Sequence, residues 1–387
     1  MRNYTNKTVY LGMDVHKKTY AVTAICEGQV VKKDTLKADP AILLAYCKKY
    51  FVGAKIESAY EAGFCGFYLH RCLEAEGIKN IVVDAAGIEV AVGDRVKTDK
   101  RDSLKLATHL SVGRLRAIRV PSAEREDCRA VTRLRETFSR QRSRFACQLK
   151  SLLFQHGMIR ADDKKKVSEK WAKVLEATPV SPGLKYAIAN YLALWRQMNI
   201  RIKEIDRELS AQAQKDGATE TIYRSVPGIG TTSARILANE IEDTLQFDNE
   251  KKLFSYTGFT PREYSSGEHI RQGHITRHGK PILRKILVQA AWRAIRLDPS
   301  LKEIFQRLSI KGGKKKAIVG VARRLVGRIH ACFRTGELYC IPLTKNKKAE
   351  EKSIVSKELW EANAAPQIVK GNLLRLAFDE KCIELNS

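Results

Sequence analysis

The sequence lacks the features of exported, disulfide-linked and membrane-spanning proteins. Its nine cysteines are odd in number, irregularly spaced and never form a Cys-x-x-Cys pair, which argues against a disulfide framework or a zinc site. No apolar run approaches the ~18 residues of a membrane span, and the N-terminus has no signal-peptide core. No Walker motif is present either, so ATP-driven chemistry is not expected. These absences predict a cytoplasmic protein with reduced thiols.

Basic residues, by contrast, are in large excess. The 387 residues include 70 Lys and Arg against 43 Asp and Glu, a formal net charge of +27. Such a charge favours a polyanionic partner, most often nucleic acid, over a small-molecule substrate. A soluble protein with scattered lysines is the plainer alternative. The length and the 44% of hydrophobic residues predict two or three domains with packed cores.

The N-terminal part predicts helices layered on a mixed sheet. Residues 8–36 alternate apolar and polar in two runs, as a hairpin does, and residues 55–61 and 78–83 are typical of further strands. Residues 65–76 and 86–109 have helical patterns. Alternation of strands and helices indicates an α/β fold.

Four carboxylates stand out in this part of the chain. Asp14 ends the first predicted strand, Glu61 ends another, and Asp99 and Asp102 lie three residues apart on one face of a predicted helix. Phosphodiester chemistry uses divalent metal ions, which carboxylate oxygens hold and often bridge. Any one of these acids alone is more often a solvated charge or a helix cap. Together they predict a divalent metal site that acts on phosphodiesters.

Two long helices are predicted next, at residues 122–157 and at about 184–214. They indicate a helical hairpin or short coiled coil, although two helices of a compact bundle would give the same pattern. Arg125, Arg129 and Arg133 recur at steps of four residues on the first of them. We expect these three arginines to hold the backbone of RNA or DNA.

Residues 221–335 predict a separate small helical domain. It opens with a Pro-Gly-Ile-Gly turn that is similar to a helix-hairpin-helix motif. In such a turn the backbone N–H groups around Gly228 and Gly230 would meet a DNA phosphate. A plain connection between two helices would look much the same.

A Ser-Ser-Gly segment follows in the same domain. A hydroxyl just before a glycine, as at Ser266, leaves room for a phosphate to approach. Ser-Ser-Gly is more often just a turn. Four nearby basic residues would supply positive charge to a pentavalent transition state: Arg271, Arg277, Lys280 and Arg284.

Taken together, these motifs resemble the DEDD-type insertion-sequence transposases, the family that includes the Piv DNA invertase. The segments GMDVHKKTYAV, YEAG and KTDKRD fit that family's RuvC-like nuclease domain. The segments SVPGIG, YTGFTPREYSSG and GHITRHGKPILRKILVQAAW fit its C-terminal transposase domain. The resemblance covers residues 8 to 335, and the tail beyond about 344 departs from the usual family length.

The resemblance implies an α/β plus α architecture in four parts. These parts are a RuvC/RNase H-like DEDD domain at residues 1–120, a helical coiled-coil or linker region at 121–218, a small helical transposase domain at 219–340 and a polar tail of unknown role at 341–387. Members of this family act as dimers that assemble into tetramers. They are associated with a noncoding bridge RNA, which pairs with donor and target DNA.

The resemblance also implies roles for particular residues. Asp14, Glu61, Asp99 and Asp102 would bind Mg²⁺, as one or two ions. A serine would join covalently to DNA, and the motif position that matches best is Ser266, with Ser265 a near alternative and Tyr264 a remote one.

The function that the sequence predicts is therefore site-specific DNA recombination that mobilises an insertion sequence, by a nucleoid-associated protein of the cytoplasm. Two alternatives stay open. A hydrolytic RuvC-like nuclease, such as a junction resolvase, needs only the four acids and leaves the Ser-Ser-Gly segment unexplained. A noncatalytic nucleic-acid-binding protein explains the charge but not the acids.

Overall fold

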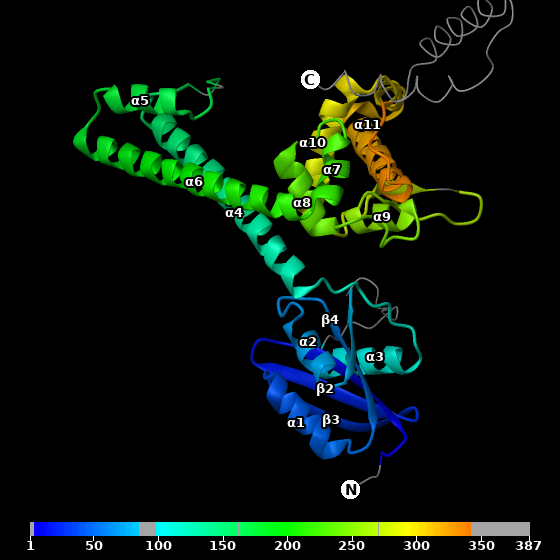
Figure 1. Ribbon diagram of the computed structural model, residues 1–387. Helices are drawn as coiled ribbons and strands as arrows, with labels where there is room; N and C mark the ends of the chain where they lie inside the picture. The colour runs from blue at the N-terminus through cyan, green and yellow to red at the C-terminus, as the bar shows by residue number, and fades with distance from the viewer. Residues whose placement is uncertain (1–3, 85–97, 161, 164, 270, 342–387) are drawn as a thin grey trace, which may run out of the picture. The chain divides into compact units, whose positions relative to one another are not determined.

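The computed structural model describes residues 4–84, 98–160, 162–163, 165–269 and 271–341 (Figure 1). The chain divides into two compact units, Met1–Ala123 and Glu124–Ser387. Part of the helix predicted at 86–109, and all but the first residue of the predicted polar tail, lie outside the described residues. Among the described helices, none is long and apolar enough to span a membrane.

The first unit is built on a five-stranded mixed sheet in the order β3-β2-β1-β4-β5. Its strands are β1 (Thr8–Val15), β2 (Thr19–Cys26), β3 (Gln29–Lys37), β4 (Lys55–Glu61) and β5 (Lys79–Val83). The β1–β2 and β2–β3 pairs are antiparallel, whereas β1–β4 and β4–β5 are parallel. The mixed α/β part of the predicted fold class is thereby confirmed.

One detail of that prediction was wrong, because residues 8–36 hold three strands rather than a two-stranded hairpin. The second turn lies at Glu27-Gly28, where both residues have positive φ, +50° and +76°. Positive φ at both central positions is the geometry of the tight turn that best fits the twist of paired strands.

Helices cover both faces of this sheet. They are α1 (Pro40–Tyr50), α2 (Tyr68–Ala75) and α3 (Asp99–Ser111). Val9, Leu11 and Met13 of β1 point into a core shared with α1 and α2. Because side chains alternate along a strand, residues 10, 12 and 14 face the other side, where α3 lies.

The second unit begins with three helices, α4 (Ala123–Gln155), α5 (Glu169–Ala177) and α6 (Pro182–Lys215). Ion pairs and hydrogen bonds link α4 to α6 in an antiparallel sense, since Arg135 binds Asp206 and Arg142 binds Asn199. At the far end of the pair the three helices share a small core: Leu149, Leu153, Ala172, Leu175, Ile188 and Leu192.

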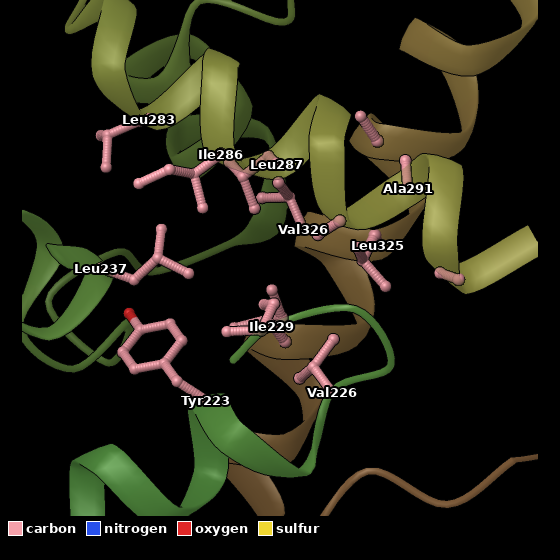
Figure 2. Packing of buried hydrophobic residues seen from close by; sticks show 14 of the residues in the cluster. Tyr223, Val226, Ile229, Leu237, Leu283, Ile286, Leu287, Ala291, Leu325 and Val326 are labelled. Atoms are coloured by element: carbon pink, nitrogen blue, oxygen red, sulfur yellow. The ribbon is translucent and has the colours of Figure 1, made fainter. Parts of the chain in front are cut away.

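The remainder of the second unit is a helical domain with one small hairpin. Its elements are α7 (Gly217–Ser225), α8 (Thr231–Ile241), α9 (Glu250–Thr257), β6 (Pro261–Glu263), β7 (Gln272–Ile275), α10 (Pro281–Leu297) and α11 (Pro299–Thr335). Figure 2 shows how Tyr223, Leu237, Leu287 and Leu325 converge from four of these helices into one core. The fourfold division of the chain at residues 120, 218 and 340 stays a prediction.

Candidate functional site

Helix α3 lies directly against β1 because residue 12 has no side chain. A Cβ atom at Gly12 would lie 2.1 Å from the backbone oxygen of Ser103 and 2.2 Å from the backbone nitrogen of Ala107. Nearby, the hydroxyls of Thr23 and Ser103 are buried and 2.9 Å apart, which links β2 to the same helix. The close approach holds the first turn of α3 beside the end of β1.

Asp14, His16 and Asp99 meet at this point. The His16 Nε2 atom lies 3.3 Å from a carboxylate oxygen of Asp14 and 3.4 Å from one of Asp99. One ligand atom from each of the three lies within 4.8 Å of the other two. Sequence analysis did not single out His16. The sequence did offer one indication of His16: it stands two residues after Asp14, and alternate residues at the end of a strand share a face.

The other two predicted acids belong to the same edge. In the parallel register of β1 with β4, Met13 pairs with Tyr60, so Asp14 and Glu61 are the next positions of neighbouring strands. Asp102 is in the first turn of α3, and its carboxylate is close enough to raise the pKa of Asp14.

Electrostatics at Asp14 favour a cation. Partial burial is the largest cause of a raised pKa at Asp14; His16 opposes it, and the negative charges of Asp99 and Asp102 add to it. A carboxylate that is partly desolvated beside other carboxylates gains from a nearby positive charge. Carboxylate oxygens are the ligands that Mg²⁺ and similar hard cations prefer, so the residues present fit a divalent metal.

The Ser-Ser-Gly segment forms the turn of the β6–β7 hairpin. Ser266 and His269 exchange two backbone hydrogen bonds of 3.2 Å, and Gly267 between them has φ +57°. The Ser265 hydroxyl donates to a carboxylate oxygen of Glu263 at 2.8 Å and accepts from the Arg271 N–H at 3.2 Å.

Ser266 differs from Ser265 in the freedom of its hydroxyl. The side chain is exposed, and its hydroxyl makes no hydrogen bond within the part of the chain that the structure describes. Ser265 stabilises the turn, whereas the Ser266 hydroxyl is exposed, and its role as a nucleophile stays a prediction.

The four basic residues predicted around this hairpin have two different surroundings. Arg271 and Arg277 are exposed, and Arg277 has φ +58°, in the left-handed region. Lys280 forms an ion pair with Glu240. Arg284 donates to the backbone oxygens of Thr257, His278 and Gly279 at 3.1–3.2 Å. Lys280 and Arg284 thus bind groups of the protein itself.

The three arginines of α4 also have partners within the protein. Arg125 binds Asp216 at 2.8 Å, Arg129 donates to the Asn239 oxygen at 2.8 Å, and Arg133 binds the Glu240 carboxylate at 3.1 Å. These contacts attach α4 to the segment around α7 and α8. Contact of the three arginines with nucleic acid stays a prediction, and their internal bonds give them a structural role.

The glycines of the predicted helix-hairpin-helix turn also differ. Gly228 has φ +87°, and a Cβ there would lie 2.6 Å from the Ala290 oxygen, so packing against α10 requires glycine. Gly230 precedes α8, at whose start the structure shows no side-chain cap. Phosphate binding at this turn stays a prediction.

The first unit thus has a mixed five-stranded sheet with Asp14 near the end of its central strand and Asp99 beside it, and this part of the chain has recognisable relatives. Residues 11–158 match the model of the DEDD transposase domain of IS110, and residues 220–306 match the Transposase IS116/IS110/IS902 family. The chain belongs to this IS110/IS116 family of transposases, which are DNA recombination enzymes.

Relatives along most of the chain have matching names. A Sinorhizobium fredii protein provisionally named transposase y4rJ is 28% identical over 361 residues, which cover 82% of this chain and 90% of that one. The transposase for insertion sequence element IS1533 of Leptospira borgpetersenii is 27% identical and covers 85% of this chain and 96% of its own. The transposase for insertion sequence element IS1111A of Coxiella burnetii is 23% identical, with 85% and 90% covered.

Proposed function

We propose that the protein mobilises an insertion sequence by cleaving and rejoining DNA with a metal-dependent acidic site and a serine nucleophile. Asp14, Glu61, Asp99 and Asp102 would hold Mg²⁺ in the first unit, and Ser266 would attack DNA from the second. The observation that carries the proposal is the meeting of Asp14, His16 and Asp99 within 4.8 Å. Glu61 lies on the strand next to Asp14, and Asp102 lies with Asp99 in the first turn of α3.

The acids have a clear part in this chemistry. A divalent cation bound among them would stabilise the negative charge that develops on a scissile phosphodiester. Asp14 is held by β1 and Asp99 by the first turn of α3, so both carboxylates stand on rigid elements. Gly12 fixes the distance between those elements, which keeps the carboxylates together before a substrate arrives.

Ser266 would carry the covalent step. Its Oγ forms a bond to phosphorus while the bond from phosphorus to one DNA oxygen breaks, which leaves a DNA hydroxyl and a phosphoserine. The hydroxyl proton passes to solvent, to which the side chain is exposed. A second DNA hydroxyl then attacks phosphorus, the Oγ–phosphorus bond breaks, and the serine takes up a proton. Because each broken phosphodiester is replaced by another, the exchange needs no ATP.

Arg271 and Arg277 would support this step, since both are exposed on the segment that carries Ser266. Positive charge near the phosphate stabilises the extra negative charge of a pentavalent transition state. Lys280 instead binds Glu240, and Arg284 binds three backbone oxygens. We therefore propose that these two residues stabilise the structure of this segment.

The proposal includes two kinds of partner beyond donor and target DNA. A noncoding bridge RNA would pair with both DNAs and select them, and homodimers would assemble into a tetramer. The resemblance to the family and the net charge of +27 support these partners. Sequencing of RNA that copurifies with the protein tests the first: it should recover a transcript of DNA next to the gene, with segments complementary to donor and target. Measurement of the mass of the protein bound to donor DNA tests the proposed tetramer.

The decisive experiment concerns a covalent adduct. Labelled donor DNA is incubated with the protein and magnesium, and denaturing gels are followed by mass spectrometry of the trapped peptide. We expect an adduct at Ser266 that Ser266→Ala and Asp14→Ala both abolish, while Ser265→Ala, the matched control one residue away, retains part of it. Cleavage without an adduct would favour a hydrolytic nuclease, and an adduct at Ser265 or Tyr264 would refute the assignment. Binding with neither cleavage nor adduct would favour a noncatalytic protein.

A further inference from the structure

Helix α11 is interrupted in a way that turns its two halves back on each other. Gly313 has φ +74° and ψ 161°, outside the helical region. A Cβ at Gly320 would lie 2.8 Å from a methyl carbon of Leu308, although residues twelve apart in one continuous helix are about 18 Å apart. Arg328 binds Asp298 at 2.5 Å, thirty positions away. The element is therefore a helical hairpin that turns at residues 311–316.

Four lysines occupy this turn. We call them the lysine tip: Lys311, Lys314, Lys315 and Lys316. All four are exposed, and within the described ranges none of them forms an ion pair or a hydrogen bond. The sequence contains no acid between Glu303 and Glu337, a stretch with nine Lys and Arg residues. No carboxylate near in sequence offsets the charge of the lysine tip.

Electrostatics within the fold disfavour this arrangement. Lys314, Lys315 and Lys316 stand in the first turn of the second half of α11, where the positive end of the helix dipole disfavours cations. They also repel one another. Arginines elsewhere in this unit show the opposite pattern, since Arg328 binds Asp298 and Arg125 binds Asp216. A cluster that opposes folding and lacks internal partners is suited to an external anion.

We propose that the lysine tip contacts the sugar–phosphate backbone of a nucleic acid. Lysine is a compact, flexible point charge that suits phosphate oxygens in any sequence, and such contacts set position rather than sequence preference. The turn projects four of these charges from the end of a hairpin that the Arg328–Asp298 pair closes at its other end. The inference rests on the proposed function, because it names a surface by which the recombinase grips its polyanionic partner.

Salt dependence of binding tests this inference. The full-length protein is kept in EDTA, so that no strand is cut, and its Kd is measured against potassium chloride. The probes are a short DNA duplex of random sequence and a structured RNA of equal length. We expect K314Q/K315Q to lower the slope of log Kd against log salt by about 1.8 on duplex DNA, at about 0.9 for each lost phosphate contact. The variant with all four lysines changed to glutamine should lower the slope further.

A matched control separates a local contact from a general effect of charge. Lys33→Gln/Lys37→Gln removes two exposed lysines from β3, in the other unit, and should leave the slope nearly unchanged. A slope change on DNA alone, on RNA alone or on both would identify which backbone the lysine tip contacts. Equal slopes for wild type and K314Q/K315Q on both probes would overturn the inference, as would an equal decrease in the control.

Two further readouts keep the inference distinct from its alternatives. The thermal unfolding midpoint of K314Q/K315Q should not fall, because the substitution relieves repulsion; a fall would indicate a structural role for the lysines and count against the inference. If wild-type protein binds neither probe in a salt-dependent way, the proposed function fails together with the inference. If wild type binds with a steep slope that K314Q/K315Q keeps, the inference alone fails.

Discussion

Gly12→Ala should separate the acids of the candidate metal centre without removing any of them. The added methyl carbon would lie 2.1 Å from the Ser103 oxygen and 2.2 Å from the Ala107 nitrogen, where ordinary contact begins near 3.4 Å. Both are backbone atoms, so no side-chain rotation relieves the clash. Helix α3 must withdraw by about 1 Å to restore van der Waals contact, and Asp99 and Asp102 move with it.

The expected destabilisation is at the upper end of the usual range for overpacking. Extra methyl groups in a packed interior cost about 1–3 kcal/mol, occasionally more. We expect about 3 kcal/mol at Gly12, because two backbone atoms of one helix are in the way. The loss should be confined to the first unit. Strand exchange should fall more steeply than the folded fraction, since the acids no longer converge.

Hydrogen exchange read by mass spectrometry measures this effect locally. Peptides from β1 and α3 should exchange faster in Gly12→Ala. All four tryptophans lie after residue 123, so their fluorescence reports the second unit and should be unchanged. Gly63→Ala is the matched control, because the same methyl there would meet only the Glu61 oxygen, at 3.9 Å. Equal protection and equal magnesium-dependent activity in the two variants would refute the reasoning.

Two further predictions concern charges. Asp14→Asn should raise the free energy of unfolding in EDTA at neutral pH: burial and neighbouring acids raise the pKa of Asp14, so the folded state loses stability as the pH rises from 3.8 through that raised pKa. The free energies of unfolding of wild type and Asp14→Asn should converge as the pH falls toward 3.8. Magnesium at a hundred times its Kd should add about 2.7 kcal/mol to the free energy of unfolding of wild type alone. An equal increase in the variant would contradict the metal centre. Glu240→Gln should destabilise the second unit by about 3 kcal/mol, because it leaves Lys280 and Arg133 without their buried counter-charge. Burial raises the pKa of Glu240, but Lys280 and Arg133 lower it overall, so the stability that the Glu240 carboxylate contributes should fade as the pH drops below 4.5. Tryptophan fluorescence in denaturant measures the destabilisation by Glu240→Gln and its pH dependence. An unchanged unfolding midpoint in the variant would count against this prediction.

Local patterns were enough to predict the elements that carry the acids. The strand predicted at residues 55–61 is β4 with the same bounds. Glu61 is its last residue, and Asp14 is the last but one residue of the neighbouring strand β1. Helix α1 was overlooked, although Asp39 caps its start and Pro40 occupies its first turn. Those two residues are a standard signal of a helix start.

Contacts between distant segments could not be predicted in the same way. His16 becomes a candidate site residue only because α3 places Asp99 beside it, and Asp99 lies 83 positions further along the chain. Likewise, Arg125 and Arg133 look like a basic stripe on a helix, and their partners Asp216 and Glu240 lie 91 and 107 positions away. No periodicity encodes such pairs, because they depend on how α4 packs against α8 and against the junction of α6 and α7, where Asp216 lies.

The same comparison changes how the net charge of +27 should be interpreted. Arginine pairs well with carboxylates and backbone oxygens inside proteins, because its planar group donates several hydrogen bonds in fixed directions. Arg129 and Arg284 do so here, and such residues add to the net charge without offering a free surface to DNA. Cations without internal partners are better guides to a polyanion. By that criterion the lysine tip and the exposed arginines beside Ser266 should dominate the salt dependence of binding, and the arginines of α4 should dominate stability.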